Sequence, residues 1–126
     1  MVPKSLKIWF VVHFFLDITF GLPLLLIPSV SAELIGLEIT QTLPLRLVGA
    51  ALIGIGSTSL IKKEGSLDSY RSLLVLKIIW SLSAIIAISL SFFETQLLVF
   101  LPILFIFVVF NIVWFYYHFK LTATND

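Results

Sequence analysis

The sequence contains no cysteine, few charged residues and only two histidines. Without cysteine, disulfides, thiol catalysis and cysteine-ligated metals or clusters are excluded. His13 and His118 lie far apart in the chain, so we expect no metal site and no metal cofactor. A net charge of +1 provides no field that would attract nucleic acid. Charged residues make up 12% of the 126 residues, against about 25% in typical soluble domains.

Apolar residues take the place of the missing charges. They form 60% of the chain, and its mean hydropathy is +1.13. A soluble protein of this length could not bury so much apolar surface, whereas a lipid bilayer accepts it. Four apolar runs, at about 6–28, 43–61, 69–93 and 97–119, approach the roughly 20 residues that crossing a bilayer requires. We therefore predict one integral membrane domain over residues 1–126 that folds as an all-α, antiparallel four-helix transmembrane bundle.

The distribution of basic residues predicts the orientation of these helices. Lysines and arginines gather before the first run, around the second connection and after the last run, at Lys4, Lys7, Lys62, Lys63, Arg71 and Lys120. The first and third connections carry glutamates and no basic residue. Because loops rich in lysine and arginine stay in the cytoplasm, we predict a multi-pass protein of the cell membrane with both termini cytoplasmic.

The first apolar run raises the question of a signal peptide. Val30-Ser31-Ala32 has small residues where a signal peptidase could cleave. A signal sequence has an apolar core of about 7–15 residues, whereas this run is longer and contains Asp17. We expect it to be retained as a spanning helix.

Five polar residues fall at membrane depth and are the candidate site: His13, Asp17, Arg46, Lys77 and Asn111. His13 and Asp17 are four residues apart, a spacing that places them on one face of a helix. A charge at the centre of a spanning helix costs about 2.5–3.5 kcal/mol, so Asp17 should not face lipid. Either Lys77 or Arg46 could pair with it, while His13 and Asn111 could supply hydrogen bonds.

Two interpretations of this polar set remain open. In the first, a buried ion pair fixes the register of the helices and has no further role. In the second, the polar groups form a pocket that binds a ligand or relays a proton through Asp17 and His13. Buried ion pairs can be purely structural, but intramembrane ionisable groups often have a function. The sequence alone therefore favours neither interpretation.

Two other patterns concern packing. Ala50, Gly54 and Thr58 follow the spacing of small residues that lets a neighbouring helix approach closely. Three aromatic residues near the predicted cytoplasmic end of the last helix, Trp114, Tyr116 and Tyr117, suit a belt at the membrane surface.

The layout of the chain resembles small four-helix bacterial membrane proteins of the DoxX-like kind. The resemblance is carried by the helix count, a polar residue in helix one and the segment Leu45-Arg46-Leu47-Val48-Gly49. It implies a membrane bundle and no particular activity. The chain is also similar to small multidrug exporters, where Asp17 would take the role of the glutamate in helix one. The chain departs from the exporter pattern in two ways. Lys77 and Arg46 would compete for that carboxylate, and the loops do not match.

Three functions follow as hypotheses, all in contact with the lipid bilayer. The first is a non-enzymatic membrane protein with a buried polar pocket for a small amphipathic molecule or lipid. The second is a proton-coupled small-molecule exporter, which would act as a homodimer. The third is a structural accessory subunit whose small-residue face docks on a larger membrane protein. No nucleophile motif supports catalysis.

Overall fold

The computed structural model describes residues 1–123, and their regular structure is entirely helical. The helices are α1 (Lys4–Leu26), α2 (Pro28–Leu34), α3 (Leu43–Ile61), α4 (Leu67–Thr95) and α5 (Phe100–Ala123). All but α2 are long and apolar enough to cross a membrane. The prediction of an all-α protein with four candidate spanning helices is therefore confirmed.

The ends of the helices follow from local chemistry. The α3 helix has the predicted bounds, whereas α4 extends beyond the apolar run at both ends. It begins early because the Ser66 hydroxyl accepts a hydrogen bond from the backbone N–H of Ser69, at 3.2 Å, and so caps the helix. It ends at Thr95, because the next residue, Gln96, adopts a left-handed conformation with φ of 57°.

The short helix α2 was not predicted. It begins at Pro28, a residue suited to the first position of a helix. It ends at Leu34, and Gly36, two residues later, has a φ of +74° that glycine adopts without strain. The backbone N–H groups of Gly36 and Leu37 donate to the carbonyls of Glu33 and Ala32, which is the Schellman arrangement that terminates helices.

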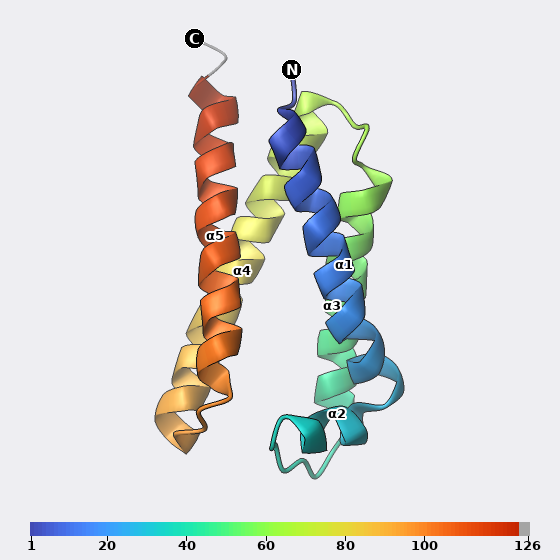
Figure 1. The fold of residues 1–126 in the computed structure, drawn as a ribbon, viewed down its shortest axis with the longest axis vertical. Coiled ribbons are helices and arrows are strands. Elements are labelled where there is room, and N and C mark those ends of the chain that lie inside the picture. Colours follow the sequence, from blue (N-terminus) through green and yellow to red (C-terminus); the bar gives the residue numbers. More distant parts are fainter. Residues whose placement is uncertain (124–126) are drawn as a thin grey trace. The chain divides into compact units, whose positions relative to one another are not determined.

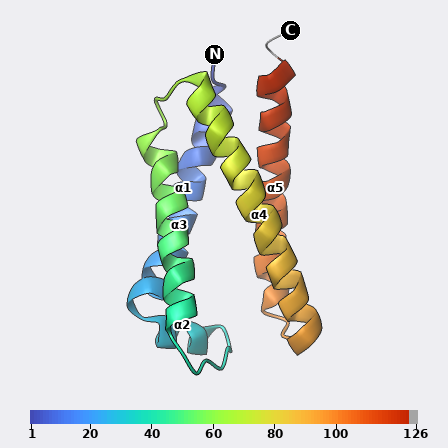
Figure 2. The same ribbon diagram turned by 180° about the vertical axis from the view of Figure 1, so that it is seen from behind.

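The chain divides into two compact units, and the first contains α1, α2 and α3. Figures 1 and 2 show α1 and α3 side by side, with α2 at the end of the pair farther from the N-terminus. Asp17 packs against Gly56, and Gly21 packs against Gly49. From the first of these contacts to the second, the residue number rises along α1 and falls along α3, so the two helices run in opposite directions.

The second unit contains α4 and α5, which also lie side by side (Figure 2). The guanidinium of Arg71 donates to the carbonyl oxygen of Leu121 at 2.8 Å. Ten residues further along α4, Ser81 lies within hydrogen-bonding distance of Asn111 on α5. The second unit is therefore an antiparallel helix pair.

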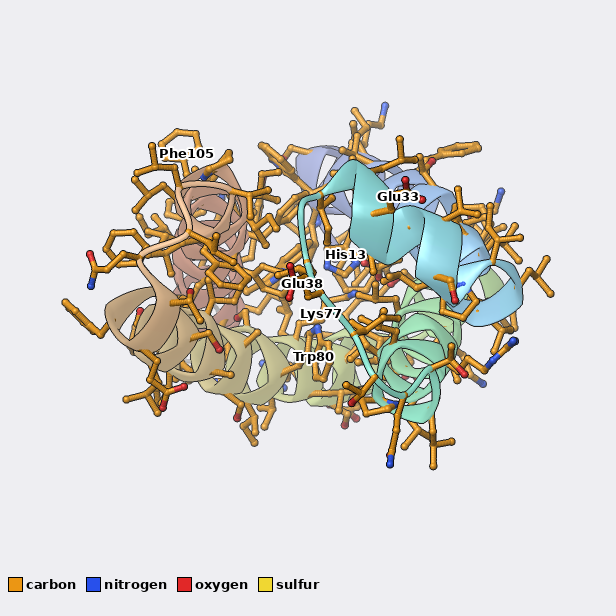
Figure 3. All side chains as sticks on the ribbon, turned by 90° about the horizontal axis from the view of Figure 1, so that it is seen from below. His13, Glu33, Glu38, Lys77, Trp80 and Phe105 are labelled. Carbon is orange, nitrogen blue, oxygen red and sulfur yellow. The ribbon has the colours of Figure 1, made fainter. Side chains whose placement is uncertain are left out.

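Burial in both units differs from that in a soluble protein, because polar side chains are buried beside a small apolar core while many large apolar side chains are exposed. The polar side chains of the spanning helices include buried ones: His13, Asp17, Ser59, Lys77, Ser81 and Asn111. Large apolar side chains such as Phe105 of α5 are exposed instead, and Figure 3 shows Phe105 pointing away from α4. Lipid is the solvent that favours this arrangement, which supports the predicted multi-pass membrane protein.

Candidate functional site

The imidazole of His13 and the carboxylate of Asp17 form a buried pair on α1. Nδ1 of His13 lies 2.7 Å from Oδ2 of Asp17. Both side chains are more than nine-tenths buried, and Figure 3 labels His13 on α1. Their four-residue spacing places them one helical turn apart, so the structure confirms the prediction that they share a face.

The buried oxygen of Asp17 retains the capacity to accept a hydrogen bond. Although His13 is within ion-pair distance of Oδ2, no described residue is aligned to donate a hydrogen bond to that oxygen. A buried carboxylate oxygen without a donor is costly. This oxygen is the feature of the unit to which the head group of a ligand could bind.

Gly56 of α3 provides the space that Asp17 occupies. A Cβ atom added at Gly56 would lie 2.6 Å from Cβ of Asp17 and 3.0 Å from its Oδ2. Real Cβ atoms do not approach so closely, so only glycine permits this packing. Ser59, one turn further along α3, is also buried and donates its hydroxyl hydrogen to the carbonyl of Ile55 at 3.1 Å.

A second pair of glycines brings the backbones of α1 and α3 together near α2. A Cβ atom added at Gly49 would lie 2.7 Å from both the carbonyl oxygen of Gly21 and the backbone nitrogen of Leu25. Small residues permit such approaches between membrane helices. Within the first unit, α3 therefore contacts α1 through the face that carries Gly49 and Gly56. The predicted face, that of Gly54, is not the contact face, because a Cβ atom added at Gly54 would meet no described atom within 4 Å.

Arg46 binds a backbone carbonyl, whereas the sequence allowed it to pair with the carboxylate of Asp17. Its Nη1 donates to the carbonyl oxygen of Leu25, near the end of α1. Arg46 precedes Gly56, the neighbour of Asp17, by ten residues of helix, or about 15 Å along the axis. The imidazole of His13 is a titratable group that lies beside the carboxylate of Asp17.

Lys77 and Asn111 belong to the second unit. The Lys77 ammonium lies 5.2 Å from the ring centroid of Trp114, a distance at which cation–π attraction operates. Trp114 and Tyr117, both expected at the membrane surface, are instead buried, whereas Tyr116 is exposed. Trp114 stacks on Phe110, with ring centroids 5.5 Å apart. The four-residue spacing between these two aromatic residues was a signal for this stacking.

Asn111 is held by a small hydrogen-bond network in the same unit. Its side-chain nitrogen lies 2.8 Å from the Ser81 hydroxyl oxygen, to which it donates. The Ser81 hydroxyl donates in turn to the carbonyl oxygen of Lys77, at 2.7 Å. The sequence indicated that Asn111 would be buried, but it did not identify Ser81 as its partner.

One ion pair of the first unit lies outside the predicted spans. Nζ of Lys7 donates to Oε2 of Glu64 at 2.7 Å, joining the start of α1 to the loop that follows α3. This hydrogen bond, with the positive charge of Lys7, holds the pKa of the Glu64 carboxyl below its ordinary value of 4.5. Because Glu64 is exposed, water and salt screen the pair, and its contribution to stability is small.

Comparison with protein-family models, curated proteins and solved structures finds no match to this chain. The DoxX-like resemblance therefore stays a prediction. Among the described residues, no three His, Cys, Asp or Glu side chains are grouped so that they could hold a metal ion. The paired acid and imidazole on α1 are the most distinctive chemical feature of the described residues.

Proposed function

We propose that this chain is a small, non-enzymatic integral membrane protein whose His13–Asp17 pair binds the polar head of an amphipathic molecule or lipid. The carboxylate of Asp17 accepts a hydrogen bond from the ligand, and His13 holds that carboxylate in place. The antiparallel four-helix bundle and the cytoplasmic location of both termini belong to the same proposal. The lysines that flank the helices support this orientation.

The acceptor atom Oδ2 of Asp17 is the observation that carries the proposal. It is buried within a helix long enough to span a membrane, and no described residue donates a hydrogen bond to it. In a low-dielectric environment a hydrogen bond to such an oxygen is stronger than in water. A hydroxyl or amine of a ligand would supply the missing donor, while its hydrocarbon part would remain among lipid chains.

The cost of this arrangement supports a role beyond packing. An ionised group at the centre of a spanning helix is unfavourable by about 2.5–3.5 kcal/mol. A pair of apolar residues would fill the same volume without that cost. Gly56 adds a further constraint, because any larger residue there would collide with Asp17.

Native mass spectrometry of the protein released from mild detergent tests the proposal. We expect the wild-type protein to retain a bound small molecule, and Asp17→Asn to lose most of it, because the substitution keeps the size of the side chain but removes one acceptor oxygen. Asp68→Asn, at a highly exposed position, is the matched control and should retain the molecule. Equal retention by both variants, or a bare wild-type protein, would contradict the proposal.

A further inference from the structure

The short helix α2 presents three different faces, each made of two residues four apart. Pro28 and Ala32 are buried against the rest of the first unit. Ser29 and Glu33 are exposed and polar. The third face consists of Val30 and Leu34, which are apolar although they are 49% and 82% exposed. Because residues four apart share a helix face, the exposed polar and the exposed apolar side chains lie on different faces of α2. The remaining residue, Ser31, is half-buried and lies between the apolar face and the buried face.

The position of α2 in the chain shows what surrounds the apolar face. The α1 helix has 23 residues and is about 34 Å long, slightly more than the roughly 30 Å hydrocarbon core of a bilayer. Its last residue, Leu26, is therefore at the boundary between acyl chains and head groups. A single residue, Ile27, separates α1 from α2, so α2 lies at this boundary too.

The segments next to α2 in the chain also expose apolar side chains. Leu26 and Ile27 precede α2 and are exposed, and Leu43 and Leu47 are exposed at the start of α3. In a membrane these side chains contact lipid. The exposed Val30 and Leu34 lie in the chain between these two lipid-contacting segments.

We propose that α2 lies in the bilayer interface, with Val30 and Leu34 among the acyl chains and Ser29 and Glu33 in water. Residues 27–42, which include α2, contain two glutamates and no lysine or arginine. Attraction to anionic lipid therefore cannot hold α2 at the surface, and burial of its apolar face does so instead. This anchors the connection between α1 and α3, independently of any ligand at Asp17.

The absence of cysteine makes the test direct, because one introduced cysteine gives one labelled site. The full chain is labelled with a nitroxide in Ser29→Cys, Val30→Cys, Glu33→Cys and Leu34→Cys, and reconstituted in phosphatidylcholine vesicles. Electron paramagnetic resonance then compares collisions with oxygen, which concentrates in the membrane, and with a water-soluble nickel complex. Two further labelled variants, Ile112→Cys in α5 and Glu64→Cys in a loop, serve as lipid and water references.

We expect the ratio of oxygen to nickel collisions to be several-fold higher at positions 30 and 34 than at positions 29 and 33. The same difference should persist when half of the lipid is phosphatidylglycerol. Equal ratios on the two faces would overturn the proposal, as would exclusion of both reagents from positions 30 and 34, because a protein segment would then cover that face. A difference that appears only with the anionic lipid would also overturn it.

Discussion

Gly56 and Asp17 are in direct contact across the first helix pair, and an added Cβ at Gly56 would lie 2.6 Å from Cβ of Asp17. Because that atom is fixed to the α1 backbone, it cannot rotate away. We expect Gly56→Ala to lower the free energy of unfolding by about 1–3 kcal/mol, the usual cost of overpacking. Denaturation of the protein in detergent micelles, followed by circular dichroism, measures the change.

Gly54→Ala is the matched control for that prediction. It makes the same chemical change two residues away, where an added Cβ would meet no described atom within 4 Å. Alanine is the better helix former by about 0.5–1 kcal/mol, so stability should be unchanged or slightly higher. Equal losses in the two variants would show that the packing of Asp17 on Gly56 does not limit stability.

The two glycines near α2 should differ in their tolerance of alanine. The added Cβ of Gly49→Ala would lie 2.7 Å from backbone atoms of α1, whereas that of Gly21→Ala would come no closer than 3.0 Å to any atom. A clash with backbone atoms can be relieved only if a whole helix moves, whereas a side chain can rotate away. We therefore expect Gly49→Ala to be the more destabilising in the same unfolding assay, and the reverse order would contradict the described packing.

The hydrogen bond between Asn111 and Ser81 predicts a measurable coupling energy. A double-mutant cycle with Ser81→Ala and Asn111→Leu removes each partner separately and together. Hydrogen bonds between membrane helices are worth about 0.6 kcal/mol on average and up to about 1.7 kcal/mol. We expect a coupling energy in this range. Additive effects of the two substitutions would mean that the 2.8 Å contact adds nothing to stability.

The pair of Lys7 and Glu64 predicts a specific dependence on pH. Since the pKa of Glu64 lies below its ordinary value of 4.5, the pair stabilises the folded state above that value, and this contribution is lost as the pH falls through the lowered pKa. Titration of the Glu64 carboxyl carbon by nuclear magnetic resonance should show Lys7→Met raising the pKa. Lys63→Met should raise it less, because Lys63 is the weaker cause.

The sequence predicted the helices well where hydrophobicity alone determines them. The bounds of α3 agree because Leu43-Pro44 starts that run and Lys62 follows it. The bounds of α4 differ because a cap at Ser66 and a left-handed Gln96 set them, and neither acts through hydropathy. The α2 helix is too short for a periodic apolar pattern, although a proline at its start and a glycine after its end were signals for it.

The sequence could predict which residues of the candidate site share a face of one helix, but not which residues meet between two helices. The spacing of His13 and Asp17 placed them on one face of α1, as the structure shows. Small residues occur on several faces of α3, so the pattern could not decide between Gly54 and Gly56. That choice depends on the packing of α1 against α3, which the sequence of a single helix does not contain.

The exposure of so many large apolar side chains has a consequence for the evolution of this protein. Exposed leucine, isoleucine and phenylalanine residues face lipid, which accepts any apolar side chain, so neutral drift should exchange these residues freely. Selection should instead preserve Asp17 and the glycine that faces it. We expect relatives of this chain to diverge most in their large exposed hydrophobic residues. The small and polar residues at the contacts between helices should be the ones that they share.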